Sequence, residues 1–288
     1  KKKSWKKTLL TYRNQRAKPR LDDKTLTSWN ALMLKGYVDA YKAFGKKEYL
    51  NSALKNASFI SEKQLRDNGA LFHNYKDGQS SINGFLEDYA FTIEAFLELY
   101  QISLDERWLQ LSKKMTDYTI ANFFDSEKHM FYFTSKEDSA IVSRNFEYRD
   151  NVIPSSNSAM AKNLFLLSKY FENTGFEEIS QQMLKNVSEE MMQYPSGFSN
   201  WLDLLLNFKN DFFEVIIVGK DVSEKAKQIN KHYLPNIIIA GSVDENNGPL
   251  FKNRFVDGET LIYVCKNNTC KLPIKDIKIA IELLNKNE

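Results

Sequence analysis

Three short stretches of the sequence concentrate side chains that could do acid–base chemistry or hold a polar ligand. They are LDDKTLTSWN at 21–30, FLEDYAF at 85–91 and RDNVIPSSNS at 149–158. A carboxylate can act as a general base, or as a general acid where burial raises its pKa. We therefore predict a catalytic role for Asp88, with Asp23 or Asp150 as the partner carboxylate.

The polar and aromatic neighbours of these carboxylates are the natural ligand-binding groups, since they offer hydroxyls, amides and ring faces. Each also has a structural interpretation: a carboxylate or serine can cap a helix start, and an aromatic at helical spacing can be core. On a helix Glu87 would point about 100° away from Asp88, so we expect only Asp88 to face the ligand. The predicted binding residues are Trp29, Asn30, Tyr89, Ser155, Asn157 and Ser158.

The elements that would position these groups are three repeated helical hairpins. In each unit a strongly apolar helix is followed by a short break and then by a more charged helix. The apolar helices begin near residues 29, 86 and 155. Helices that are apolar over most of their circumference are buried on several sides, which predicts an inner layer covered by an outer one. Parallel inner helices would bring all three stretches to one end of the layer.

This pattern predicts a mainly α fold, a partial α/α toroid with a small α/β addition. We assign the hairpins to 1–208, the α/β segment to 209–265 and a closing helix to 266–288. Within the addition, EVIIVG (214–219), NIIIAG (236–241) and TLIYVC (260–265) predict strands.

The composition of the 288 residues excludes several classes of protein. The net charge of +3 comes from five lysines among the first seven residues, so no basic face for nucleic acid is expected. No apolar run approaches the roughly 20 residues that span a bilayer. We predict no metal, no cofactor, no membrane partner and a cytoplasmic location. Cys265 and Cys270 do not form a Cys-x-x-Cys motif, and they are either two thiols or a reversible disulfide.

Four motifs resemble a known family. LDDKTLTSWNALM, FLEDYAF, IPSSNSAMAKNLFLL and YVCKNNTCKLP occur in this order in the family that includes bacterial YyaL and animal spermatogenesis-associated protein 20. The resemblance runs from about residue 13 to residue 284. It implies a thioredoxin-like domain followed by a toroid similar to six-hairpin glycosidases, of which this chain would be the C-terminal part. Ala31, Ser156 and the Asp150-Asn151-Val152 run depart from the usual family pattern.

The resemblance implies a carbohydrate-binding or carbohydrate-processing, glycosidase-like pocket at the starts of the inner helices. Two alternatives stay open. The toroid could be a non-catalytic scaffold that binds a partner and serves the thioredoxin-like domain. It could also be a sugar epimerase or isomerase that uses His73, which precedes FLEDYAF in the chain.

Overall fold

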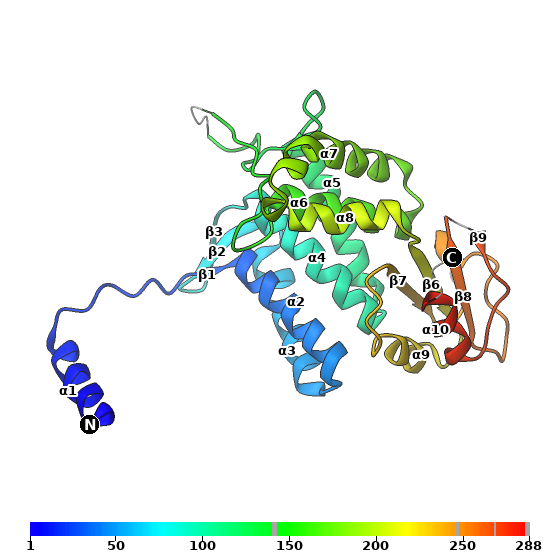
Figure 1. Ribbon diagram of the computed structural model, residues 1–288, viewed down its shortest axis with the longest axis horizontal. Coiled ribbons are helices and arrows are strands. Elements are labelled where there is room, and N and C mark those ends of the chain that lie inside the picture. The colour runs from blue at the N-terminus through cyan, green and yellow to red at the C-terminus, as the bar shows by residue number, and fades with distance from the viewer. Residues whose placement is uncertain (140–142, 246–247, 268, 286–288) are drawn as a thin grey trace.

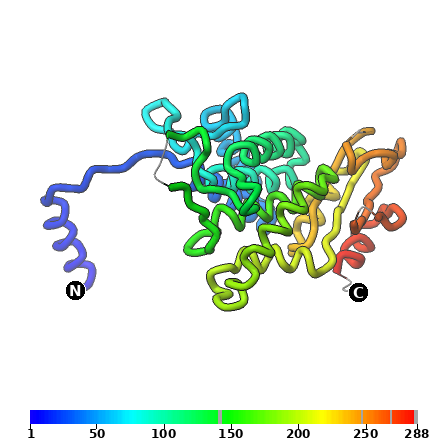
Figure 2. Tube along the Cα trace, turned by 90° about the horizontal axis from the view of Figure 1, so that it is seen from above, coloured from blue at the N-terminus to red at the C-terminus, as the bar shows by residue number. Residues whose placement is uncertain are grey.

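The computed structural model describes residues 1–139, 143–245, 248–267 and 269–285. The lysine-rich N-terminal segment forms α1 (Lys2–Gln15), in which no residue is buried. An extended stretch separates α1 from the body, and Figures 1 and 2 show α1 standing away from it. The basic excess of the chain therefore lies on a solvated helix, as its position in the sequence predicts.

The body is built from three helical hairpins in two layers. The inner helices α2 (Thr27–Phe44), α4 (Leu86–Ser103) and α6 (Ser156–Phe171) lie side by side, with α4 in the middle. Their partners α3 (Lys47–Phe59), α5 (Glu106–Phe123) and α7 (Thr174–Gln193) form the outer layer. A further helix, α8 (Ser199–Lys209), packs on α6 and α7. The predicted mainly α fold, with an inner layer of helices covered by an outer one, is confirmed.

The position of each inner helix decides how much of it is buried. Helix α4 contacts α2, α6 and α5, and nearly all of its residues are shielded from water. Helix α2 lies at the end of the layer and buries one side only. Trp29, Met33 and Phe44 on α2 are more than half exposed, at 66%, 55% and 67%. The prediction of an apolar, buried circumference is thus correct for α4 and α6 and wrong for α2, because no further helix of the described chain covers its outer side.

Short sheets connect the hairpins. After α3 the chain makes a π-helical turn (Ile60–Gln64) and enters the antiparallel sheet β1-β2-β3. Its strands are β1 (Thr25–Leu26), β2 (Phe72–Lys76) and β3 (Gln79–Asn83), so β2 lies against the segment that leads into α2. A second small sheet pairs β4 (Phe124–Asp125) with β5 (Met130–Phe131).

The C-terminal part forms the predicted α/β addition. Its sheet has the order β7-β6-β8-β9, with β6 (Phe213–Val218) parallel to β7 (Ile237–Ser242) and antiparallel to β8 (Leu261–Lys266). The edge strand β9 (Thr269–Cys270) extends the sheet beyond residue 265. Helices α9 (Val222–Ile229) and α10 (Ile277–Asn285) cover one face of the sheet. A 3-10 turn (Pro249–Phe251) lies between β7 and β8, and another (Pro195–Gly197) lies between α7 and α8.

The addition is fastened to the inner helices through the outer edge of β7. The side-chain oxygen of Gln101 on α4 accepts a hydrogen bond from the Ile239 backbone N–H at 3.1 Å. The Tyr170 hydroxyl on α6 donates to the Ile239 carbonyl at 3.2 Å. Asn230, just after α9, donates to the backbone carbonyl of Gln101 at 3.1 Å. Two inner helices thereby satisfy both backbone groups of a buried residue on an edge strand.

Replacing Gln101 with alanine tests this attachment. The change leaves the buried Ile239 N–H without its acceptor, so we expect the free energy of unfolding to fall by about 1–3 kcal/mol. Urea denaturation followed by far-UV circular dichroism measures it. Gln110→Ala is the matched control, since the Gln110 side chain is exposed and donates to Glu106 one turn away. Equal effects of the two substitutions would contradict the attachment.

Candidate active site at the helix starts

Asp88 lies at the centre of the candidate site and is completely buried. One of its oxygens, Oδ1, accepts a hydrogen bond from the backbone N–H of Ser28 at 2.9 Å. The other, Oδ2, accepts from the backbone N–H of Phe85 at 2.9 Å and shares a hydrogen bond with His73 Nδ1, also at 2.9 Å. Burial raises the pKa of Asp88, whereas the hydrogen bonds from His73, Phe85 and Ser28 oppose that shift. The two backbone N–H donors favour the ionised form of the carboxylate against this effect of burial.

His73 is held over this carboxylate by the sheet rather than by a helix. It lies on β2, and its ring packs against Phe85 with 4.7 Å between ring centroids. The hydrogen bond to Asp88 raises the pKa of the imidazole, while burial acts in the opposite direction. An ionised Asp88 only accepts, so beside it Nδ1 of His73 would carry the proton, and in a neutral imidazole the lone pair would then be on Nε2.

Glu87 completes the cluster. It is half-buried and accepts a hydrogen bond from the Ser28 hydroxyl at 3.2 Å. Burial is the main effect that raises the pKa of Glu87, and the negative charges of Asp88 and Glu147 add to it. One ligand atom from each of His73, Glu87 and Asp88 lies within 4.8 Å of the others. A carboxyl group whose pKa is raised therefore lies close to the imidazole of His73.

The expectation that Glu87 points away from the site is wrong. In the first turn of α4, the Asp88 side chain turns back to the N–H of Phe85 and so stays under the helix start. Ser28 contacts both acids, Asp88 through its N–H and Glu87 through its hydroxyl, which brings them to the same side. Of the two acidic side chains, Asp88 is completely buried and Glu87 is partly exposed.

The two carboxylates predicted as partners of Asp88 have other contacts. Asp23 is about half exposed and forms an ion pair with Lys76 on β2 at 2.5 Å. Asp150 is buried and accepts from the Ser155 N–H at 2.9 Å and from the Asn200 N–H at 2.8 Å. Asp150 thus bonds to the starts of α6 and α8. A catalytic role for either residue stays a prediction.

The predicted binding residues on α2 and α4 differ in their exposure. Trp29 has an exposed ring in the first turn of α2, one residue after Ser28. The Asn30 side chain donates to the Leu26 carbonyl at 2.8 Å within its own helix start. Tyr89 is buried, its hydroxyl accepts from the Leu71 N–H at 2.8 Å, and its ring stacks on Tyr118. The side chains of Asn30 and Tyr89 thus bond within the protein, whereas the Trp29 ring is exposed to solvent.

At the start of α6 the predicted binding residues are buried in local hydrogen bonds. The Ser155 hydroxyl caps the helix by accepting from the Ser158 N–H at 3.1 Å. The Ser158 hydroxyl donates to Asp150 at 2.6 Å. The Asn157 amide donates to the carbonyls of Phe131 and Glu147 at 2.8 and 2.9 Å. This cluster holds β5 and α8 against α6, and contact with a ligand stays a prediction.

Two members of the site carry little sequence signal. The stretch ALFHNY indicates a strand, but nothing in it shows that His73 returns to a helix start 15 residues later in the chain. Ser28 lies in the opening stretch of α2, where a serine is usually a cap. His73 could have been found by looking for a histidine on a predicted hairpin that directly precedes a helix beginning with acidic residues.

The cluster also has the composition of a metal site, because His73, Glu87 and Asp88 each offer one ligand atom. Asp88, however, already accepts three hydrogen bonds, and a cation would have to displace the His73 contact. The donor set therefore fits proton transfer better than cation binding.

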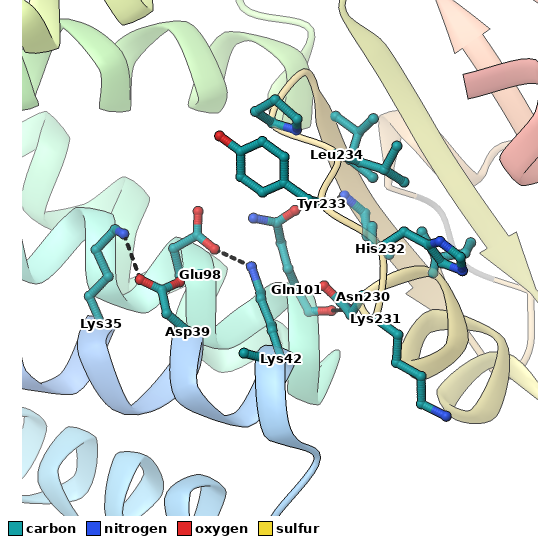
Figure 3. Close-up of a pocket in the computed structure, with 15 residues that line it drawn as sticks. Lys35, Asp39, Lys42, Glu98, Gln101, Asn230, Lys231, His232, Tyr233 and Leu234 are labelled. Carbon is teal, nitrogen blue, oxygen red and sulfur yellow. Dashed lines mark hydrogen bonds and ion pairs between the residues drawn. The ribbon is translucent and has the colours of Figure 1, made fainter. Parts of the chain in front are cut away.

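A separate cavity lies toward the C-terminal ends of α2 and α4 (Figure 3). It has a volume of about 560 Å³ and is bounded on the other side by the segment 229–239. Its helical wall carries two ion pairs, Lys35–Asp39 at 2.9 Å and Lys42–Glu98. The charged side chains of this helical wall are thus paired with one another, and Lys231 lines the opposite side of the cavity.

Relatives are found among known proteins, although no family profile matches the chain. The chain is 28% identical over 98% of its length to the uncharacterized protein B0495.5 of Caenorhabditis elegans. It is 27% identical over 93% of its length to spermatogenesis-associated protein 20 of Homo sapiens. These matches cover 40% and 37% of the two relatives, so the chain spans about two fifths of their length. The resemblance that the motifs predict is confirmed, and the thioredoxin-like domain stays a prediction.

Solved structures with a similar helical arrangement include two sugar-active proteins. A cellobiose 2-epimerase from Bacillus thermoamylovorans is 16% identical, with a TM-score of 0.49 over 57% of this chain and 44% of its own. A GH76 α-mannanase from Bacteroides thetaiotaomicron is 16% identical, with a TM-score of 0.49 over 61% of this chain and 47% of its own. Within the described residues, no helix has both the length and the apolar character needed to cross a membrane.

Asp88→Asn tests the central contact. An amide cannot accept on both sides, so the substitution leaves a buried N–H or the imidazole without its acceptor. We expect a loss of roughly 2–4 kcal/mol in the free energy of unfolding. Urea denaturation measures the loss, and Asp67→Asn, at an exposed aspartate, should change stability by less than about 0.5 kcal/mol. A similar small change for Asp88→Asn would show that the carboxylate is not needed.

The shift of the His73 pKa predicts a pH dependence of stability. Its pKa in the folded protein is raised above the ordinary value of about 6.5 that applies to the unfolded chain. The stabilisation is therefore complete below about pH 6.5 and is lost as the pH rises through the folded-state value. We expect the stability difference between wild type and His73→Gln to shrink across that range. Urea titrations from acidic to alkaline pH measure it, and a difference that grows with pH would contradict the assignment.

Proposed function

We propose that the starts of α2 and α4 form an acid–base site that acts on a carbohydrate, with His73 as the base and Glu87 as the acid. The observation that supports this most is the hydrogen bond between His73 Nδ1 and the buried Asp88. It fixes the ring and its tautomer, which leaves Nε2 as the proton acceptor. Asp88 is then a positioning residue, because it has no exposed surface with which to touch a substrate.

The pair of groups suits proton transfer on a sugar. In an isomerisation or epimerisation, Nε2 of His73 removes the proton from the carbon next to a carbonyl. Glu87, whose pKa is raised by burial, donates its proton to the carbonyl oxygen, and both protons return in the second half of the reaction. Hydrolysis typically uses two carboxylates that both reach the substrate, and a completely buried Asp88 does not suit that role.

A carbohydrate is the substrate class that the family resemblance implies. Two features near the site suit it: the exposed ring of Trp29, which can stack on the apolar face of a sugar, and the Phe85 ring beside His73. Trp29 follows Ser28 in the first turn of α2.

Proton NMR in deuterium oxide tests the proposal with the chain and a panel of free aldoses, ketoses and disaccharides. Isomerisation exchanges solvent deuterium into the sugar, whereas hydrolysis releases a new reducing end. We expect exchange, reduced about 10²- to 10⁴-fold in His73→Gln and in Glu87→Gln. His232→Gln, at an exposed histidine, and Glu48→Gln, in the exposed first turn of α3, are the matched controls.

Two outcomes would contradict the assignment. Release of reducing ends without deuterium exchange would replace proton transfer by hydrolysis. Activity that is abolished by a chelator and restored by a divalent cation would make His73, Glu87 and Asp88 metal ligands instead.

The scaffold alternative is favoured by the exposed side of α2. Trp29, Met33 and Phe44 recur there at helical spacing and are more than half exposed, which suits a protein contact. If neither exchange nor a sugar-dependent thermal shift is found across the panel, this alternative replaces the acid–base site.

A further inference from the structure

The two cysteines form a disulfide that joins β8 to β9. Cys265 and Cys270 are direct register partners at the edge of the C-terminal sheet. Both lie among the described residues, and neither is a free thiol. Of the two states that the sequence leaves open, the structure shows the oxidised one.

The two sulfurs have different surroundings. Cys265 is 2% exposed and belongs to the main hydrophobic core. Cys270 is partly exposed, lies on a two-residue edge strand and is followed by the exposed Lys271 and Leu272. A thiolate that attacks a disulfide must approach a sulfur that solvent can reach. Cys270 is therefore the sulfur open to attack, and Cys265 is the leaving group.

A positively charged side chain, Arg254, lies beside Cys265, the leaving group. Nη1 of Arg254 lies 3.6 Å from the Cys265 sulfur, and the guanidinium also lies over the Tyr263 ring at 5.4 Å. The charges of Glu172 and Glu214 act on Arg254, and Glu214 is the register partner of Cys265 on β6. An arginine keeps its charge at all physiological pH values, so it can stabilise a thiolate as the bond to Cys270 breaks.

We propose that Cys265–Cys270 is a thiol–disulfide exchange site for a dithiol reductant. One thiolate of the dithiol attacks Cys270, the bond between the two cysteines breaks, and Cys265 leaves as a thiolate beside Arg254. The second thiol of the reductant, as its thiolate, then attacks the mixed disulfide and releases Cys270. The dithiol ends as a disulfide, the protein gains two thiols, and two electrons and two protons pass between them.

The fold is expected to survive this reduction. The bridge closes a loop of only a few residues, and a short loop contributes less chain-entropy stabilisation than a long one. Strand β9 is the outermost strand, so its release leaves the pairing of β6, β7 and β8 in place. The two redox states then differ in whether β9 is covalently pinned to β8. This inference does not depend on the acid–base site.

The first test is native reduction. The folded chain is treated with dithiothreitol without denaturant, its thiols are alkylated at intervals, and the modified cysteines are identified by mass spectrometry. We expect both thiols to appear together while the far-UV circular dichroism stays unchanged. A bond that is reduced only after the protein unfolds would overturn the proposal.

The direction of attack is tested with single-cysteine variants. In Cys265→Ser only Cys270 remains, and in Cys270→Ser only Cys265 remains. We expect Cys270 to react with an aromatic disulfide reagent at least roughly tenfold faster, because the rate follows access to the sulfur. Equal rates, or a faster Cys265, would reverse the assignment.

The role of Arg254 is tested by the rate of reduction. Without the guanidinium the leaving thiolate is less stable, so Arg254→Gln should slow reduction by dithiothreitol about three- to tenfold. Arg254→Lys should recover part of the rate, and Lys252→Gln, an exposed cation in the same link, should stay within roughly twofold of wild type. If Arg254→Gln unfolds the protein, Arg254→Lys decides alone: a rate below that of wild type is expected, because an ammonium does not reproduce the guanidinium geometry, and an unchanged rate would overturn the role of Arg254. Unchanged rates in both folded Arg254 variants would overturn the role of the cation.

Discussion

The carboxylate of Asp88 is the contact on which the rest of this end of the molecule depends. An ionised carboxylate without water is costly unless donors surround it. Its donors come from three separate segments, the start of α2, the start of α4 and the strand β2. All three must be in place before the charge is stabilised. The same hydrogen bonds therefore join the start of α2 to the start of α4 and hold the His73 ring in place.

The elements could be predicted from the sequence because their signals are local. Apolar spacing marks the hairpins, and the runs around Val215, Ile239 and Val264 mark the strands of the addition. Periodicity does not show which element packs against an apolar side. It shows that α2 has an apolar side with Trp29 and Met33, but it does not show whether another helix covers that side.

The candidate site could be predicted only in part, for the same reason. Asp88 could be found, because an acidic residue at an apolar helix start is a local feature. Its pairing with His73 depends on how a hairpin folds back across the helix start. Tyr89 shows the reverse case: its spacing and neighbours suit a binding residue, yet its hydroxyl bonds to Leu71 inside the core. Helical periodicity gives the face of a residue, whereas only tertiary contacts decide whether that face reaches solvent.

The inner helices have different surroundings at their two ends. Their starts gather acids, hydroxyls and the imidazole, while their C-terminal halves carry the paired charges of the cavity wall and the contacts to β7. The bonds from Gln101 and Tyr170 to Ile239 also have a consequence outside the molecule. An uncovered edge strand can pair with a strand of another chain and begin aggregation. Here one edge of the C-terminal sheet is occupied by helix side chains, and the other ends in the two-residue strand β9. The addition thus presents little free edge on which copies of the protein could assemble into intermolecular sheets.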